Sequence, residues 1–310
     1  MKTEKNGYLY LLITVMLFST YEAVVKTLVN KIDPFQINFI RFLVGGLILF
    51  VFLLVKSDIK ISMNDFFWLV GVGIINVVLS MSLMQLSLYM KGAQASVSAV
   101  VFSSNPIFVA VFAAIMDREK LSVNKIAGLF IGLIGILVIF EDKFITGFSD
   151  FKSPFFALLS AVFYGLYTVL GRRLSIRLGS LKMNAYSFIF GSVALLPLLL
   201  FFRIPVVRFD YSGLWQVVYL SVFVTGLAYL SYFKGLSIAG ASKGSLVFFV
   251  KPALASAIAV IFLKEQMTVN LVIGTVLVIL GITTVIYWNG FKEKIASNLK
   301  DFCIKWRINK

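Results

Sequence analysis

Long apolar runs alternate with short polar connections along almost the whole chain. A helix that crosses roughly 30 Å of hydrocarbon needs about 20 mostly apolar residues, because each residue adds about 1.5 Å. The pattern predicts an all-α polytopic membrane protein. Its ten expected transmembrane helices are residues 8–28, 34–55, 66–90, 93–116, 123–140, 153–173, 183–202, 213–235, 241–263 and 269–288.

The connections between these runs leave no room for a soluble domain. The first run is long enough to cross the membrane, and it lacks the small-residue cleavage site of a signal peptide. We therefore expect it to remain in the protein as a transmembrane helix.

Basic residues predict the orientation of the chain. If the N-terminus is cytoplasmic, the cytoplasmic segments hold 18 of the 29 Lys and Arg residues, and the outside segments hold eight. Positive charge is enriched on the cytoplasmic side, so both termini are expected in the cytoplasm, with the protein in the cell (cytoplasmic) membrane. The three other cations, Arg41, Lys234 and Lys251, lie within or at the ends of apolar runs.

Composition agrees with a membrane protein and excludes several other classes. Hydrophobic residues make up 60% of the 310 positions, and the mean hydropathy is +0.95. The net charge of +15 does not indicate nucleic-acid binding, because the basic residues are spread over the loops. The chain has no histidine and one cysteine, Cys303, and it lacks a glycine-rich phosphate loop. We therefore expect no metal site, no cofactor and no enzyme activity.

The second half of the chain repeats the first at an offset of 146 residues. Residues 105–135, NPIFVAVFAAIMDREKLSVNKIAGLFIGLIG, align with residues 251–281, KPALASAIAVIFLKEQMTVNLVIGTVLVILG. Each half holds five expected spans, so the second half must enter the membrane from the opposite side. This predicts two inverted five-helix repeats, an arrangement of secondary transporters. The expected units are 1–147, 148–290 and a basic tail, 291–310.

The repeat carries a family resemblance. The stretch TGLAYLSYFKGLSIAGASKGSLVFFVKPALASAIAVIFLKEQMT (225–268), its weaker partner at 77–122, and FSTYEAVVK (18–26) resemble the drug/metabolite transporter superfamily and its EamA-type carriers. The resemblance implies a ten-helix exporter of amino acids, metabolites or drugs. It also implies a central cavity lined by the first, third and fourth helices of each half. The segment 18–22 departs from the family's aromatic-Gly-Ser-Asn pattern, so the resemblance does not supply the substrate.

One lysine, Lys251, lies inside an expected transmembrane helix, and the repeat gives it an equivalent position in the first half. The offset pairs Lys251 with Asn105, and each directly precedes a proline, Pro252 or Pro106. Proline removes a helix donor and clashes with the carbonyl four residues earlier, so we expect helix kinks that present polar side chains near the bilayer centre. A charge at that depth indicates function. The alternative is a structural salt bridge or a neutral lysine.

Glu22 is the only acidic residue well inside an expected span. Its depth allows it to pair with Lys251, but Arg41 lies at a comparable depth, and Lys26 is one turn away on the same helix face. Two interpretations remain open: Glu22 is a cavity residue, or it is the structural partner of Arg41.

Other polar residues are weaker candidates for the cavity. The third expected helix of each half carries such residues, and we expect them to contact either a solute or a neighbouring helix. They are Gln85, Asn76, Tyr229 and Tyr232.

Some residues are expected to have structural roles. Glu119 and Glu265 come shortly before Ser122 and Thr268, which are expected N-caps. We expect the two glutamates to satisfy amides at the starts of the helices that follow. The glycines of GLFIG, Gly128 and Gly132, favour close helix packing, either within the chain or in a dimer.

The C-terminal tail has apolar residues at helical spacing with lysines between them. This pattern is typical of an amphipathic helix on the inner leaflet, and a disordered basic tail is the alternative.

Together these features predict a secondary transporter that moves a small organic solute by alternating access, with an amino acid, a metabolite or a drug-like compound as the substrate class. Lys251 would bind an anionic group, and Glu22 would bind an amine or exchange a coupling proton. The expected partners are this solute and membrane lipid, for a monomer or a homodimer. The alternatives are a membrane-embedded enzyme and a structural or receptor membrane protein.

Overall fold

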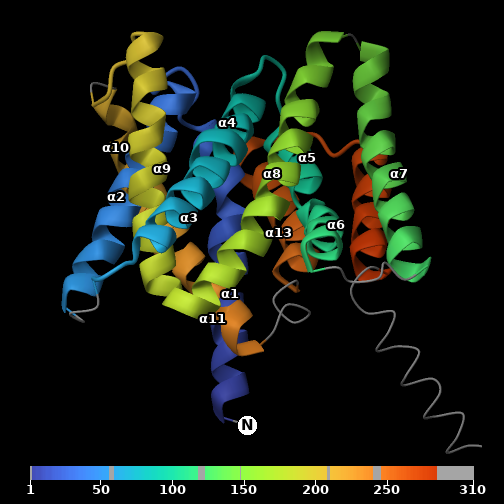
Figure 1. Ribbon diagram of the computed structural model, residues 1–310. Coiled ribbons are helices and arrows are strands. Elements are labelled where there is room, and N and C mark those ends of the chain that lie inside the picture. The colour runs from blue at the N-terminus through green and yellow to red at the C-terminus, as the bar shows by residue number, and fades with distance from the viewer. Residues whose placement is uncertain are drawn as a thin grey trace, which may run out of the picture.

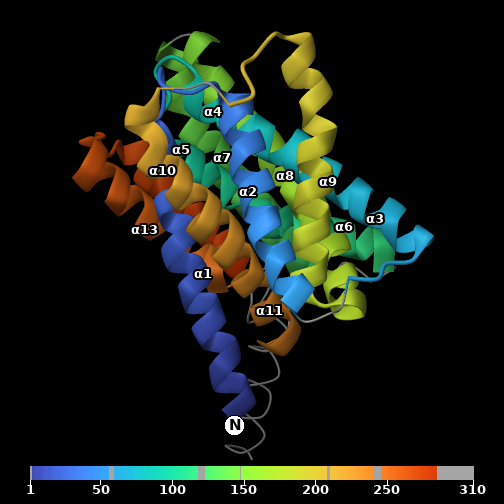
Figure 2. The ribbon, with the colours of Figure 1, turned by 90° about the vertical axis from the view of Figure 1, so that its left-hand side faces the viewer.

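The computed structural model describes residues 2–55, 59–117, 123–146, 148–207, 210–239 and 246–284 (Figure 1). Within these ranges the chain is helical apart from short connections, and it contains no strand. The helices form one bundle, and the N-terminal end of α1 extends beyond it (Figure 2). They are α1 (Lys2–Lys26), α2 (Pro34–Val55), α3 (Met63–Gly73), η1 (Ile74–Met81), α4 (Ser82–Tyr89), α5 (Ala95–Phe102), α6 (Asn105–Asp117), α7 (Val123–Thr146), α8 (Phe148–Leu178), α9 (Ser180–Phe201), η2 (Tyr211–Gly213), α10 (Leu214–Tyr219), η3 (Leu220–Leu227), α11 (Ala228–Ala239), α13 (Leu246–Leu263) and the last described helix, Val269–Thr284.

Seven helices of the described part are long and apolar enough to cross a membrane. Three shorter apolar helices lie where the other three spans are expected: Ile126–Ile139, Val250–Leu263 and Val269–Thr284. The protein is therefore an all-helical, multi-pass membrane protein. The predicted amphipathic tail and Cys303 lie outside the described residues.

The boundaries of the helices repeat at the offset found in the sequence. Helix α9 starts and ends 146 residues after α2, and η3 starts and ends 146 residues after η1. The start of α8 follows that of α1 at the same distance. We call two residues 146 positions apart repeat-equivalent.

Both η1 and η3 are π-helical, with wider turns than an α-helix. Each lies in the middle of the third membrane-length helix of its half. Isolated π-helical turns inside α-helices are rare and are often found at functional sites. Two of them at repeat-equivalent positions mark the third helices as the place where both halves depart from regular helix geometry.

Helices of one half pack mainly against helices of the other half. The N-terminal helix α1 contacts α11 and α13, and α2 contacts α9 and η3. Glycines allow two of these helices to approach closely, because a Cβ at Gly281 would lie only 2.7 Å from the carbonyl oxygen of Gly128. The glycines of α7 thus pack against the last described helix within the same chain.

The two proline-containing helices differ. The first is interrupted at Ser103 and Ser104, and a new helix starts at Asn105, so Pro106 lies in the first turn, where its missing N–H removes no hydrogen bond. Its repeat equivalent, Pro252, lies inside the continuous helix α13. The two prolines therefore occupy different local structures in the two halves.

Glu265 caps a helix of the opposite half. Its carboxylate accepts hydrogen bonds from the backbone N–H groups of Ala95 and Ser96, at 2.6 and 3.0 Å, and from the Ser96 hydroxyl at 2.6 Å. The prediction that Glu265 satisfies the start of the helix that follows it is therefore wrong. Thr268 caps that helix, with 3.2 Å between its Oγ1 and Leu271 N. The chain folds so that α5, which is far away in sequence, presents its N-terminus to Glu265. Glu119 lies outside the described residues.

Replacing Glu265 with alanine should lower the thermal stability of the purified protein, because amides at the start of α5 lose their acceptor. Loss of a helix cap costs about 1–2 kcal/mol. Thermal unfolding in detergent measures the effect. The control is Gln266→Ala, which removes a neighbouring exposed side chain and should leave the melting temperature unchanged. A Glu265→Ala protein that unfolds at the wild-type temperature would contradict a stabilising role.

Candidate functional site

A lysine and a glutamate form an ion pair inside the bundle. Lys251 on α13 donates to Glu22 on α1, with 2.5 Å between Nζ and Oε1, and the side chains are 2% and 1% exposed. The ammonium also lies 4.6 Å from the ring centre of Phe102. The second oxygen of Glu22, Oε2, is buried and accepts no hydrogen bond from the described residues. The pair joins the two halves and leaves one carboxylate oxygen open to another group.

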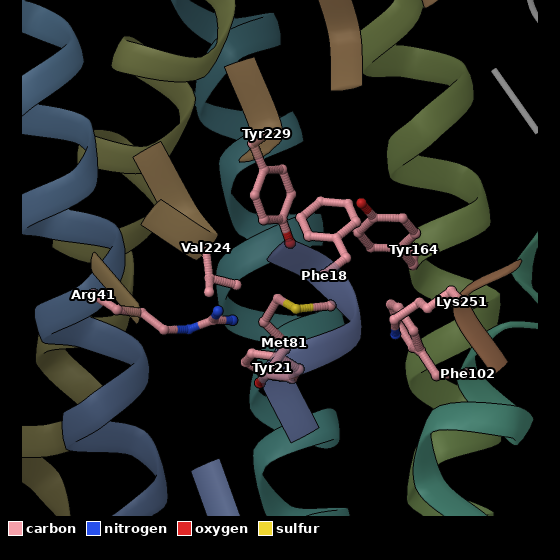
Figure 3. Close-up of a pocket in the computed structure, with 9 residues that line it drawn as sticks. All are labelled: Phe18, Tyr21, Arg41, Met81, Phe102, Tyr164, Val224, Tyr229 and Lys251. Atoms are coloured by element: carbon pink, nitrogen blue, oxygen red, sulfur yellow. The ribbon is translucent and has the colours of Figure 1, made fainter. Parts of the chain in front are cut away.

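The ammonium of this pair borders a small cavity between the halves (Figure 3). The cavity has a volume of about 20 Å³, close to the space that one water molecule needs. A solute with several heavy atoms therefore requires helices to move apart. Arg41 and Lys251 approach the cavity from opposite sides, with mostly aromatic side chains between them (Figure 3). The lining residues are Phe18, Tyr21, Arg41, Met81, Phe102, Tyr164, Val224, Tyr229 and Lys251.

Arg41 is a third charged group at the cavity, and among the described residues it does not form an ion pair with Glu22. Its side chain is 1% exposed. The guanidinium carbon lies 4.7 Å from the ring centre of Tyr21 and 4.3 Å from that of Phe42, so aromatic faces contact the cation. Its Nη2 atom is buried and has no acceptor in the described part of the chain.

Asn38 fixes the orientation of Arg41. Its Oδ1 accepts a hydrogen bond from Arg41 Nε at 3.1 Å. Its Nδ2 donates to the carbonyl oxygen of Val77 at 2.7 Å and to Ser82 Oγ at 3.1 Å. Val77 belongs to the π-helical segment η1. Arg41 is therefore held through Asn38 by the irregular part of the third helix.

An aromatic cluster covers the side of the cavity near α11. Tyr229 makes edge contacts with Phe18 and Phe188, with ring centres 5.1 and 5.2 Å apart. The ring centre of Tyr232 lies 6.1 Å from that of Phe18 and 5.9 Å from that of Phe248. Of the two predicted tyrosines, Tyr229 lines the cavity, and Tyr232 packs against the lining.

Three predicted polar residues are fully buried away from the cavity lining. They are Asn76, Gln85 and Asn105. The Asn105 amide donates to the carbonyl oxygen of Phe102 at 2.9 Å. Phe102 is the last residue of α5, so its carbonyl lies at the end of a helix, and the Asn105 side chain supplies a donor at the interruption between α5 and α6.

Several lining residues have a similar residue at the repeat-equivalent position, but the charges are not repeated. Aromatic residues occupy the same positions in both halves: Phe18 and Tyr164, Tyr21 and Tyr167, Phe102 and Phe248. Each charged residue has an uncharged polar equivalent: Thr168 for Glu22, Ser187 for Arg41, and Asn105 for Lys251. The scaffold is therefore shared, and each charge is present in one half only.

Several lining residues were not among the sequence candidates. Phe18 and Tyr21 stood in the segment that departs from the family pattern, and the 146-residue offset, applied to the first span, pairs them with Tyr164 and Tyr167. That symmetry was a usable signal. Met81 and Val224 gave no signal, because an apolar residue in a membrane helix is equally expected to face lipid, a neighbouring helix or a cavity.

A bundle of membrane-length helices, built from two related halves with a charged cavity between them, has the organisation of a polytopic membrane carrier. The chain belongs to the EamA-like transporter family, whose model matches residues 5–141 and 152–287. The two matches correspond to the two halves. The protein is therefore a membrane transporter, and the family implies a small-molecule substrate.

Individual relatives agree with this assignment. The chain is 34% identical over 309 residues to an "Uncharacterized transporter" of Clostridium kluyveri, covering 96% of each chain. It is 27% identical over 260 residues to "Uncharacterized transporter YoaV" of Bacillus subtilis, covering 83% of this chain and 88% of the relative. A solved crystal structure with 19% identity matches 91% of this chain and 97% of its own, with a TM-score of 0.67. That likeness shows a shared fold.

Replacing Lys251 with methionine should destabilise the protein, because Glu22 then remains as a buried carboxylate without a counter-ion. Removing one partner of a buried pair typically costs about 3–5 kcal/mol. The double variant Lys251→Met with Glu22→Gln removes both charges and should recover most of the stability. Thermal unfolding in detergent measures both variants. Full stability of the single variant would show that the pair does not contribute to the fold.

Proposed function

We propose that the protein is a secondary transporter that exports a small organic solute across the cytoplasmic membrane by alternating access. In this proposal, ten transmembrane helices form two inverted five-helix repeats, and both termini lie in the cytoplasm. The observation that carries the proposal is the buried pair of Lys251 and Glu22 beside a cavity between the two halves. An ionisable residue inside a membrane is costly and is by default a functional group.

The contacts around the cavity support a mechanism in which the two halves move against each other. The pair connects α1 of the first half with α13 of the second, and these helices are in direct contact. The cavity is too small for an organic solute, which is expected of a closed state. Loading requires α1 and α13 to separate on one side, and release requires them to separate on the other.

Glu22 supplies the chemistry that links solute and pair. Its Oε1 holds Lys251, while Oε2 has no donor among the described residues. An amine of the solute can donate to Oε2, or a proton can bind there and weaken the attraction to Lys251. Both events change the strength of the contact between α1 and α13, so both couple an occupied cavity to movement of the helices.

Purified protein in liposomes should transport members of a panel of amino acids and organic acids, assayed with and without a proton gradient. The double variant Lys251→Met with Glu22→Gln is the matched control, because it preserves the shape of the pair and removes its charges. We expect this variant to insert and unfold normally and to lose at least about tenfold in rate, since a charge-assisted contact contributes about 1.5–3 kcal/mol. Equal transport by the variant and the wild type would refute a role of the pair in transport.

The proposed topology has its own test. Tags at the N- and C-termini should be accessible only from the cytoplasmic side, and a label in the segment from Lys143 to Lys152 only from outside. Single-cysteine labelling in a Cys303→Ser background, in intact cells and in inverted vesicles, measures this. If the two termini lie on opposite sides, the number of spans is odd, and the arrangement of two inverted five-helix repeats is excluded.

A further inference from the structure

We propose that Arg41 is the anion-binding group of the cavity and that the solute carries a carboxylate on a small, largely apolar body. This inference rests on the proposed transport function and specifies its substrate class. It assigns the anion to the second helix of the first half, whereas the family resemblance expects the cavity to be lined by the first, third and fourth helices.

The charges at the cavity do not balance. Lys251 and Glu22 neutralise each other through their ion pair. Arg41 forms no ion pair with a carboxylate of the described residues, and an arginine side chain carries a positive charge. The three groups together carry one net positive charge in a site shielded from water. A buried cation without a counter-ion is unfavourable, so the site favours a ligand with one negative charge.

The guanidinium of Arg41 is held in a fixed orientation. Asn38 holds Nε at 3.1 Å, and the rings of Tyr21 and Phe42 contact the cation. Nη2 remains buried without an acceptor, and the guanidinium end of the side chain points toward the centre of the cavity (Figure 3). Buried donors in proteins are nearly always hydrogen-bonded. Two N–H groups on a fixed plane match a carboxylate, which binds arginine through parallel hydrogen bonds.

Lys251 is less suited than Arg41 to bind the anion. Its ammonium already donates to Glu22 at 2.5 Å. A carboxylate placed beside it would also approach the negative charge of Glu22. Arg41 lies across the cavity from Lys251 (Figure 3), so an anion bound at Arg41 keeps the existing pair intact.

The wall between the two cations indicates the body of the solute. Phe18, Phe102, Tyr164 and Tyr229 contribute aromatic rings to the lining. Such a surface favours an apolar or aromatic group over a second charge. If the solute also has an amine, Oε2 of Glu22 offers an acceptor. A monocarboxylate with an apolar body therefore fits best.

The test measures binding to purified full-length protein in detergent. The probes are acetate, benzoate and phenylacetate, each compared with its neutral amide, together with 2-phenylethylamine as a cation. Isothermal titration and the rise in melting temperature report binding. We expect at least one aromatic carboxylate to bind, and its amide and the amine to bind at least about 30-fold more weakly, as is typical for the loss of one desolvated charge contact.

Two substitutions at Arg41 separate recognition from structure. Arg41→Gln should lose about 30-fold or more in carboxylate affinity, while the melting temperature without ligand stays the same or rises, because an uncompensated buried charge is removed. Arg41→Lys keeps the charge and loses the planar fork, so its affinity should be intermediate. Ser187→Ala, at the repeat-equivalent position, is the control and should bind like the wild type.

The outcomes distinguish this inference from the transport proposal. Carboxylate binding that depends on Arg41, without transport in liposomes, supports the anion site and contradicts the carrier. Transport that is unchanged in Arg41→Gln supports the carrier and overturns the anion site. A melting temperature lowered by Arg41→Gln together with unchanged carboxylate affinity, or no binding of any carboxylate to the wild type, also overturns it.

Discussion

The central constraint on this structure is the burial of an ion pair within a membrane-spanning bundle. Removing two charges from water costs several kcal/mol for each ion, and the cost is recovered only when the partners are held in good geometry. Lys251 and Glu22 come from opposite halves of the chain and are in direct contact. The halves must therefore interlock around them, with α1 packed between α11 and α13, and with glycines allowing the backbones to approach.

The same constraint explains why irregular backbone occurs where it does. In hydrocarbon, a polar backbone group without a partner is costly, so departures from α-helical geometry survive only when other groups satisfy them. The π-helical turn η1 is satisfied in this way, because Asn38 and Ser82 both donate to the carbonyl oxygen of Val77. The interruption after Phe102 is satisfied by the side chain of Asn105. At η1 the group that satisfies the irregular backbone, Asn38, also holds Arg41 at the cavity.

Much of the helical architecture could be predicted from sequence, because the length of each apolar run and the repeat at 146 residues are visible in the order of residues alone. The depth of Lys251 and of Glu22 could be counted along their helices, so their pairing was one of the predicted alternatives. The partner of Glu265 could not be predicted, since α5 is about 170 positions away, and nothing in the spacing indicates which helix start reaches it. The orientation of Arg41 depends on the rotation of α2 and on Asn38, which only the packed bundle determines.

The absence of repeated charges in a repeated scaffold has an evolutionary consequence. Two identical copies of the first half would carry Glu22 and Arg41 twice, and they would place Asn105 where Lys251 now pairs with Glu22. A charge at a position whose repeat equivalent is uncharged requires two halves that can mutate independently. Two halves within one chain have this independence, and the different residues at the equivalent positions Asn105 and Lys251 make use of it. Neither half can therefore replace the other, although both match the same family model.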